Sequence, residues 1–292
     1  MGILLSVIIP VYNDQTGIDD CLTALANQTY QQNRYEVIVV DNASNPPINI
    51  SSKFSNFARL VVCNKPGSYA ARNAGIAVAK GKILAFTDAD CIPNQNWLSK
   101  GSTILESEGG AKIIGGSVNF KLSKKPTSVE LYQYLVGFMQ QENIEIRGFT
   151  VTANLLATRS QFEVIGLFNE NLLSGGDLEW SLRAIKAGYS IKYSPDVIVY
   201  TTPRISLNSA IRQTRRVAGG RFYLKKYYGK MLNNFSTTKR YRSLWSSIKW
   251  ILTHPELDSW NKFKVFVVAT ILKLSHTVET IRLHLFGKPE RR

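Results

Sequence analysis

The first hundred residues alternate short, β-branched apolar runs with segments whose apolar residues recur at helical spacing. Because the runs are continuously apolar, they predict strands that are covered on both faces, as in a parallel sheet. Strands followed by helices in this order predict stacked β–α–β units and an α/β fold. The predicted strands are residues 4–9, 35–40, 59–62 and 82–87, and the predicted helices are 19–28 and 68–80. Pro10 is expected to stop the first strand, and Ser68 is expected to cap the second helix.

The pattern is less regular after residue 100 and turns helical after Pro203. Residues 113–120, 191–193 and 197–200 predict strands, and residues 177–187 predict a helix. A C-terminal helix is predicted to be amphipathic because its apolar residues recur at three- and four-residue intervals. That stripe consists of Phe263, Phe266, Val267, Ile271, Leu274, Val278, Ile281 and Leu285.

The charge of the chain is concentrated in its last third. The chain has 36 Lys and Arg against 21 Asp and Glu, a net charge of +15, and residues 201–292 hold 19 of the basic and 4 of the acidic side chains. The first 200 residues are therefore balanced, whereas the tail calls for an anionic partner. The hydrophobic fraction of 44% excludes a wholly disordered chain.

The location of the protein is predicted from what the sequence lacks. Three cysteines are too few and too scattered for a disulfide framework or a zinc site, which favours a reducing compartment. The N-terminus has no signal-peptide pattern. The apolar stretch from Val265 to Leu272 is much shorter than the roughly 20 residues of a membrane span. We expect a cytoplasmic protein. Its basic tail either attaches it peripherally to the cytoplasmic face of the membrane or packs as a helical cap on the preceding domain, with solvated charges.

Polar residues follow the predicted parallel strands where each one ends. Asn13 follows the first strand, Asp41 the second, and Asp88 and Asp90 the fourth. The carboxyl ends of parallel strands meet at one edge of a sheet, where ligands of open α/β folds bind. Two carboxylates two residues apart repel each other unless a cation lies between them, and Mg²⁺ or Mn²⁺ takes such carboxylates together with substrate phosphates. A solvated acidic pair is the alternative.

The segment Gly67–Gly75 opens a helix with small residues and a single arginine, Arg72. Arg72 is placed to reach a phosphate or to hold the Asp88–Asp90 loop, and the alternative is an arginine that faces solvent. The chain has neither a Gly-x-Gly-x-x-Gly nor a Gly-Lys-Ser/Thr sequence, so the usual dinucleotide and P-loop phosphate cradles are missing.

Five motifs together resemble the family 2 glycosyltransferases of the GT-A fold, and their order and spacing match over roughly residues 3–222. They are Ser6–Asn13, Val39–Ser44, Ala71–Gly75, Phe86–Cys91, and Gly175–Trp180 with Arg183 and Gly188. Each motif is weak alone, and the set is specific. The resemblance implies a Rossmann-like, mostly parallel central sheet flanked by helices.

The resemblance also implies an activity and a set of site residues. The reaction is an inverting transfer of a sugar from a nucleotide-diphosphate sugar, with UDP-sugars favoured, to a hydroxyl of a glycan or lipid-linked acceptor, as in polysaccharide biosynthesis. Asp177 matches the general base, and Asp88 and Asp90 match the residues that hold Mn²⁺ or Mg²⁺. Nucleotide-binding roles are implied for Pro10, Val11, Tyr12, Asn13, Asp41, Arg72 and Asp88.

Three positions depart from the family pattern, the mildest being Asn42, where many members have a second Asp. Many members have Glu-Asp where this chain has Gly176-Asp177, so one acidic neighbour of the base is missing. Many members also have His where this chain has Thr201, which leaves a metal with fewer protein ligands. Glu179 is nearby but on the next face of the helix, which makes it a weaker candidate for the base.

Glu179 and three further residues are candidates for contact with the acceptor or the diphosphate. Trp180 is suited to stack on an acceptor sugar or to anchor the core, and we favour the core. Arg215 and Arg216 lie in a segment that faintly resembles the Gln-x-x-Arg-Trp signature of processive synthases, with Val217 in place of Trp. A solvated basic helix is the alternative for these two arginines.

The expected organisation follows from the resemblance and the charge. Residues 1–120 are expected to form the nucleotide-sugar-binding half of the domain, 121–235 its acceptor-side half, and 236–292 a basic amphipathic helical extension. Two other functions stay open: a nucleotidyltransferase that makes the activated sugar, and a membrane- or nucleic-acid-binding module that uses the basic tail. The acidic residues argue for the enzyme, with an anionic membrane surface as a further partner and no nucleic acid.

Overall fold

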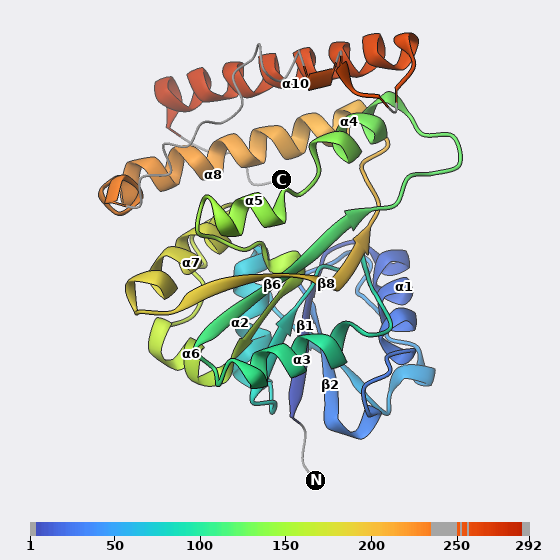
Figure 1. Ribbon diagram of the computed structural model, residues 1–292, viewed down its shortest axis with the longest axis vertical. Coiled ribbons are helices and arrows are strands. Elements are labelled where there is room, and N and C mark those ends of the chain that lie inside the picture. The colour runs from blue at the N-terminus through green and yellow to red at the C-terminus, as the bar shows by residue number, and fades with distance from the viewer. Residues whose placement is uncertain (1–3, 235–249, 252, 256, 288–292) are drawn as a thin grey trace. The chain divides into compact units, whose positions relative to one another are not determined.

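The computed structural model describes residues 4–234, 250–251, 253–255 and 257–287, which form two compact units (Figure 1). The first unit consists of residues 1–119, 138–172 and 176–201, and the second of residues 120–137, 173–175 and 202–292. Residues 236–249 of the expected C-terminal extension lie outside the described residues.

An eight-stranded sheet forms the frame of the first unit, in the order β3-β2-β1-β4-β7-β6-β8-β5. Neighbouring strands from β3 through β4 are parallel, whereas β7 is antiparallel to β4 and β6, and β5 is antiparallel to β8. The predicted α/β class is confirmed, and the parallel part is the one that the apolar runs predicted. The strands are β1 (Leu5–Val11), β2 (Tyr35–Asp41), β3 (Ala58–Val62), β4 (Ile83–Phe86), β5 (Cys91–Pro93), β6 (Lys112–Phe120), β7 (Leu155–Thr158) and β8 (Ser190–Thr201).

Helices flank this sheet and bury their apolar faces on it (Figure 1). Helix α1 shows the principle, because Ile18, Cys21, Leu22 and Leu25 at three- and four-residue spacing are all buried. The helices of this unit are α1 (Gln15–Ala26), α2 (Ser68–Val78), α3 (Trp97–Ser107), α5 (Gln140–Glu145), α6 (Arg159–Ile165) and α7 (Gly176–Lys186), and the 3₁₀ turns are η1 (Gln32–Arg34), η2 (Ser52–Phe54) and η3 (Thr152–Asn154).

Asn154 joins three elements at the centre of this unit. Its side chain is fully buried, accepts a hydrogen bond from Nε1 of Trp97 at 2.8 Å, and donates to the carbonyl oxygens of Ser117 and Val197, also at 2.8 Å. The amide therefore satisfies groups on α3, β6 and β8 that water does not reach.

Three local predictions were wrong, each for a physical reason. Strand β1 continues through Pro10 to Val11, because β4 ends opposite Ile8 and no neighbour needs the missing N–H of the proline. Helix α2 starts at Ser68 and is preceded by Gly67, whose φ of 126° is accessible to glycine, so Ser68 is not the cap. The two strands predicted between 191 and 200 form one strand, β8.

The second unit is helical and has its own small core. Helices α4 (Ser128–Val136), α8 (Leu207–Asn234) and α10 (Ser259–Phe286) pack together, with α8 and α10 side by side (Figure 1). Its buried clusters combine Val129 and Leu131 of α4 with Val265, Val268 and Leu272 of α10. None of the helices in the part of the chain that is described is both long and apolar enough to cross a membrane.

The apolar stripe predicted for the C-terminal helix lies mostly on the exposed side of α10. Phe263, Val267, Leu274, Val278, Ile281 and Leu285 are exposed, and Phe266 and Ile271 are half-buried. The buried side of the same helix is a second apolar line, formed by Val265, Val268, Leu272 and Leu283. Helix α10 is thus apolar on two faces, of which one packs on its neighbours.

Candidate active site

The ends of β1 and β2 are fastened to each other by polar contacts. Asp41 is buried, and its two carboxylate oxygens accept hydrogen bonds from the backbone N–H groups of Ser44 (2.9 Å) and Ile48 (3.1 Å). The N–H of Asn13 donates to Oγ of Ser44 at 2.8 Å, and its side-chain oxygen accepts from the N–H of Asn45 at 2.8 Å. Asp41 therefore shapes the loop that follows β2.

The four nucleotide-binding candidates at the end of β1 differ in exposure. Pro10 and Val11 are buried in β1, whereas Tyr12 and Asn13 are exposed just beyond it. A ligand at this edge of the sheet would contact Tyr12 and Asn13 directly, with the buried pair behind them.

The Asp88–Asp90 segment follows β4 at the same edge of the sheet. The guanidinium of Arg72 donates from Nη2 to Oδ1 of Asp88 at 2.5 Å, which holds this carboxylate against α2. The Arg72 side chain is only 4% exposed, and its Nε has no hydrogen-bond partner among the described residues. Arg72 thus holds the loop as expected, and it keeps a buried donor close to the predicted phosphate site.

Both carboxylates of the segment act on the same two thiols. The pKa of Cys21 and of Cys91 is raised, first by burial and then by the charges of Asp88 and Asp90. Asp88 is partly exposed and Asp90 exposed, so the carboxylate pair borders solvent. No cluster of three or more His, Cys, Asp and Glu able to hold a metal ion occurs among the described residues.

Thr201 lies beside this segment, at the end of β8. It pairs with Cys91 across the β5–β8 ladder, and its hydroxyl donates to the backbone oxygen of Asp90 at 3.2 Å. The position at which many family members have His therefore adjoins the carboxylate pair. The threonine supports the backbone of the loop.

Asp177 lies in the first turn of α7, where its carboxylate contacts α2. Oδ1 accepts a hydrogen bond from the backbone N–H of Leu178 at 3.0 Å and from the hydroxyl of Tyr69 at 3.3 Å. Burial raises the pKa of the Asp177 carboxyl, against the lowering effects of backbone N–H groups, Arg72 and Tyr69. A carboxylate whose proton affinity is raised is a better general base.

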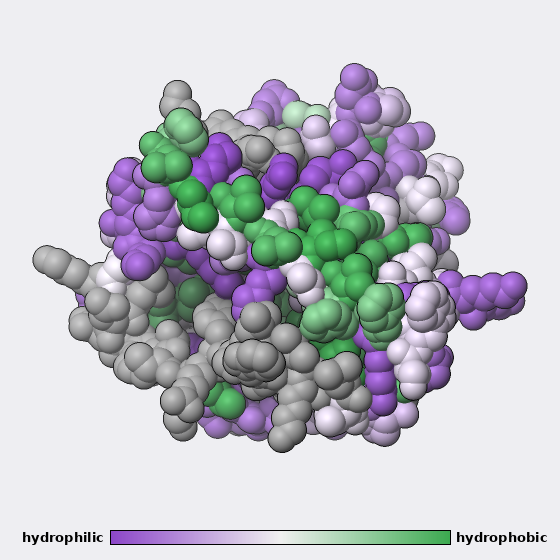
Figure 2. Space-filling view, turned by 90° about the horizontal axis from the view of Figure 1, so that it is seen from above, coloured by the Kyte–Doolittle hydropathy of each residue, from purple (hydrophilic) through white to green (hydrophobic). Residues whose placement is uncertain are grey.

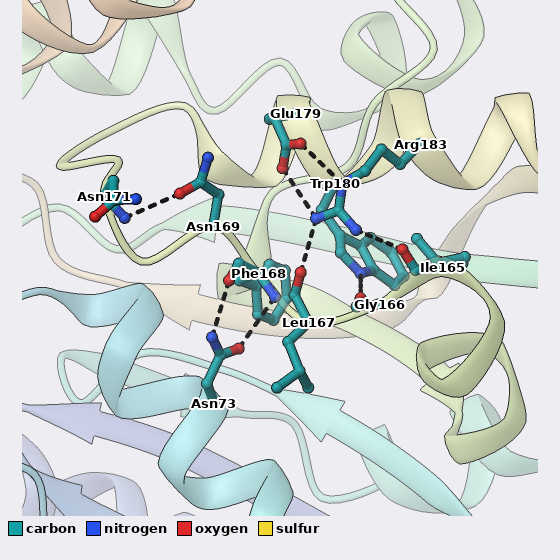
Figure 3. A network of polar contacts seen from close by, with 10 residues as sticks. All are labelled: Asn73, Ile165, Gly166, Leu167, Phe168, Asn169, Asn171, Glu179, Trp180 and Arg183. Atoms are coloured by element: carbon teal, nitrogen blue, oxygen red, sulfur yellow. Dashed lines mark hydrogen bonds and ion pairs between the residues drawn. The ribbon is translucent and has the colours of Figure 1, made fainter.

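Glu179 and Trp180 are parts of a buried network (Figure 3). Arg183 donates from Nε and Nη2 to the two carboxylate oxygens of Glu179 at 2.8 and 3.0 Å, and it also donates to the carbonyl oxygens of Ile165 and Leu167. Trp180 is fully buried, stacks on Phe162 at 4.6 Å and donates from Nε1 to the carbonyl oxygen of Gly166.

Asn73 fastens the same network to α2. Its side chain donates to the carbonyl oxygen of Phe168 at 2.9 Å and accepts from the N–H of Phe168 at 3.1 Å (Figure 3). The geometry thus favours the core interpretation of Trp180 and gives Glu179 a structural partner. Arg215 and Arg216 are exposed on α8, in the second unit.

Comparison with known proteins identifies the family. Residues 6–156, more than half of the chain, match the profile of the family described as "Glycosyl transferase family 2". The chain belongs to glycosyl transferase family 2. The family resemblance that the five motifs indicated is confirmed.

Two curated relatives extend this finding. Glycosyltransferase AglE of Haloferax volcanii is 41% identical over 198 residues, which cover 66% of this chain and 65% of AglE. The probable glycosyltransferase YdaM of Bacillus subtilis is 26% identical over 266 residues, which cover 85% of this chain and 62% of YdaM. The chain therefore spans less than two thirds of the length of each of these relatives.

Solved structures support the GT-A fold of this family 2 member. The mannosyltransferase PcManGT of Pyrobaculum calidifontis, in complex with GDP-Man and Mn²⁺, gives a TM-score of 0.61 at 18% identity and covers 99% of this chain and 88% of that one. Residues 1–349 of Staphylococcus aureus TarS, in complex with UDP, give 0.53 at 18% identity over 98% and 92% of the two chains.

Sequence reasoning missed one residue that contacts the predicted base, Tyr69. It is separated from Asp177 by 108 positions and occupies a helix of small residues that carries no acidic or basic signal at that point. The sequence offered one indirect signal, the glycine at position 176, where the family often has a large side chain.

Proposed function

We propose that the protein transfers a sugar from a nucleotide-diphosphate sugar to an acceptor hydroxyl with inversion, and that Asp177 takes the proton of that hydroxyl. The observation that best supports this role is the partly buried carboxylate of Asp177, whose pKa is raised by burial. The GDP-Man bound in the PcManGT structure and the UDP bound in the TarS structure support this donor class. The acceptor is proposed to be a hydroxyl of a glycan or a lipid-linked sugar.

The carboxylates of Asp88 and Asp90 fit a divalent cation. Both carboxylates raise the pKa of the Cys21 and Cys91 thiols, and both border solvent. A cation bound to them would take its remaining ligands from the phosphates of the substrate. Mg²⁺ and Mn²⁺ suit one or two protein carboxylates together with phosphate oxygens, so a cluster of three protein ligands is not required. When bound, the cation would offset negative charge on the leaving diphosphate.

The protein residues divide the remaining work. Tyr12 and Asn13 contact the nucleoside, and the loop held by Asp41 closes that side of the site. Arg72 keeps Asp88 in place and adds positive charge for the diphosphate. Asp177 orients the acceptor hydroxyl and accepts its proton as the sugar–phosphate bond breaks. No covalent sugar–enzyme intermediate is needed, because the hydroxyl attacks the anomeric carbon from the face opposite the diphosphate.

Two substitutions test these roles. Asp177→Asn should keep nucleotide-sugar binding and lower the transfer rate by about 100-fold or more, the usual contribution of a general base. Asp90→Ala should weaken binding of UDP or GDP in Mn²⁺ and leave binding in EDTA unchanged. Calorimetric titration measures binding, and release of UDP or GDP from UDP-GlcNAc and GDP-mannose measures turnover. Normal turnover of Asp177→Asn would remove the base, and metal-dependent binding that survives Asp90→Ala would remove the cation site.

The exposed face of α10 supports a second proposed property, attachment to an anionic membrane surface. Apart from Phe286 at the end of the helix, its large exposed apolar side chains lie, at 3.6 residues per turn, within about 40° of one line along the helix. They are Trp260, Phe263, Val267, Leu274, Val278, Ile281 and Leu285, each 38–71% exposed. Figure 2 views the molecule from the α10 side and shows apolar side chains gathered in a band beside hydrophilic ones.

Charge on α10 supports lipid as the occupant of this face. Lys264 and Arg282 flank the apolar line on one side, and Lys262 and Lys273 flank it on the other, at about 80–120°. The single acidic residue of the helix, Glu279, is buried and paired with Arg282. An apolar line between rows of cations is the pattern of helices that lie in the headgroup region of anionic membranes. This property would hold the enzyme at the cytoplasmic face of the membrane, close to a lipid-linked acceptor.

Vesicle sedimentation tests the membrane proposal. The full chain should pellet with vesicles of phosphatidylcholine and phosphatidylserine at low salt, at least tenfold less with pure phosphatidylcholine, and less again in 0.5 M NaCl. Leu274→Glu with Val278→Glu should abolish pelleting, whereas Ser55→Glu with Asn56→Glu, which adds the same charge to an exposed turn of the first unit, should not. Failure to pellet with anionic vesicles would refute the proposal. A dimer that the Leu274→Glu/Val278→Glu variant no longer forms would instead assign the exposed face of α10 to a second copy of the chain.

A further inference from the structure

The ring of Tyr69 lies directly over the backbone of Gly176. A Cβ atom placed on Gly176 would come within 2.7 Å of Cε2, 2.8 Å of Cζ and 2.9 Å of Cδ2 of that ring, closer than such atoms approach in proteins. The ring is 5% exposed and is held from its other sides by Phe168 at 5.8 Å and the guanidinium of Arg72 at 5.6 Å. The ring therefore has little freedom to move aside, and any residue larger than glycine at position 176 would collide with it.

The hydroxyl of Tyr69 contacts Asp177 twice. It donates to Oδ1 of the carboxylate at 3.3 Å and accepts from the backbone N–H of Asp177 at 3.3 Å. One hydroxyl thus bridges the backbone and the side chain of the same residue, at the N-terminal turn of α7. The charged and titratable groups that act on the carboxyl from the packed elements are Tyr69 and Arg72, both on α2.

These observations explain why the loss of the family's acidic neighbour at position 176 is tolerated in this chain. The space beside the backbone of that position is filled by an aromatic ring from another helix, and the ring carries a hydroxyl that the carboxylate uses. We propose that Tyr69 is the positioning residue of Asp177, and that Gly176 and Tyr69 act as one matched pair. The proposal rests on the proposed role of Asp177 as the base.

The hydroxyl has two effects on the carboxylate. It restricts rotation of the Asp177 side chain, so that Oδ2 is left for the acceptor hydroxyl. A donor hydrogen bond also favours the ionised form, because it stabilises the charge. Without it, one of the groups that oppose the effect of burial would be lost, so the pKa of Asp177 would rise further and less of the base would be ionised at a given pH.

Tyr69→Phe removes the hydroxyl and keeps the ring, so it is the first test. Carboxyl ¹³C NMR of Asp-labelled protein, with the Asp177 signal identified by its loss in Asp177→Asn, should show a higher pKa for Asp177 in Tyr69→Phe. The matched control is Tyr35→Phe, which removes another buried tyrosine hydroxyl, bonded at 2.8 Å to the carbonyl oxygen of Leu25 and distant in sequence from the site. The control should leave the Asp177 titration unchanged.

Turnover gives the second readout. The rate of Tyr69→Phe, measured as UDP or GDP release, should fall about tenfold, the size expected from one hydrogen bond to a charged group. The fall should be larger at low pH than at high pH, because the variant has the higher Asp177 pKa. Gly176→Ala should lower turnover strongly in the wild-type background and much less in Tyr69→Ala, where the colliding ring is gone.

The outcomes separate this proposal from the proposed function. An unchanged Asp177 titration in Tyr69→Phe overturns the positioning role, and an equal effect of Gly176→Ala in both backgrounds overturns the matched pair. Full turnover of Asp177→Asn instead overturns the assignment of the base and leaves the NMR result valid as a statement about the contact.

Discussion

Arg183→Met tests the interpretation of Glu179 as a structural residue. Glu179 is buried, with 4% of its side chain exposed, and both of its oxygens are occupied by Arg183, whose side chain is 26% exposed. Removal of the arginine leaves a buried carboxylate without its counter-charge, and the carbonyl oxygens of Ile165 and Leu167 lose a donor (Figure 3).

The magnitude follows from the burial of the pair. Breaking a buried ion pair by removing one partner costs about 3–5 kcal/mol, mostly the cost of the charge left behind. Because Arg183 is a quarter exposed, water reaches part of the gap, and we expect about 3 kcal/mol. Glu179→Gln keeps an oxygen acceptor and removes the charge, so it should cost about 1 kcal/mol. The double variant Glu179→Gln/Arg183→Met should therefore be more stable than Arg183→Met alone.

Urea unfolding followed by tryptophan fluorescence measures these differences, since Trp180 lies in the same network. Lys100→Met is the control, because its pair with Asp196 is exposed on both sides and should contribute less than about 1 kcal/mol. A double variant that is less stable than Arg183→Met would refute the reasoning. So would loss of turnover in folded Glu179→Gln at temperatures well below its midpoint, which would return Glu179 to the list of candidate bases.

Three further predictions concern the site and its frame. Asp177→Asn should raise the Tm at pH 7.5 by about 2–4 °C, as measured by calorimetry. The reason is that burial raises the pKa of this carboxyl, so its ionised form is unfavourable in the folded state. The gain in Tm should vanish below about pH 4, where the carboxyl is protonated in both the folded and the unfolded state. Cys21 and Cys91, whose thiol pKa values are raised by burial, should resist iodoacetamide at pH 8 in the folded protein, while half-buried Cys63 reacts; mass spectrometry of digests would show equal labelling if this is wrong. Asn154→Ala should lower the unfolding free energy by about 3 kcal/mol, because it leaves the indole N–H of Trp97 and two buried carbonyl oxygens without a hydrogen-bond partner. A loss under about 1 kcal/mol in urea titration would contradict this prediction.

The parallel strands and the residues at their ends were predictable because the signal is local. The apolar run Val37–Val40 of strand β2 ends at Asp41, and β4 ends just before the Asp88–Asp90 segment. The order of these elements in the sequence predicts that both ends lie at one edge of the sheet. The strand β8 was harder, because Ser194, Pro195 and Asp196 read as a break. In the structure β5 pairs with Val199–Thr201 of β8 and ends short of Pro195, so β5 does not need the missing N–H of the proline.

Helix α10 shows what periodicity cannot decide. The sequence predicted one apolar stripe and left open whether a membrane or the protein covers it. The structure has two apolar lines at helical spacing, and packing on α4 and α8 selects the one that contains Val265 and Leu272. Tyr69 escaped prediction for a related reason: its role depends on a contact with Gly176 that no spacing along the chain encodes.

A single turn of α2 joins both ends of the candidate site. Tyr69 and Arg72 are three residues apart, so they project from the same side of the helix, one to Asp177 and the other to Asp88. The separation between these two contacts is therefore set by the pitch of a hydrogen-bonded helix. Inserting one residue before Tyr69 within this helix would rotate both side chains by about 100° and break both contacts together. We expect this helix to accept substitutions at its partly exposed positions Ser68 and Ala74 far more readily than any change in its length.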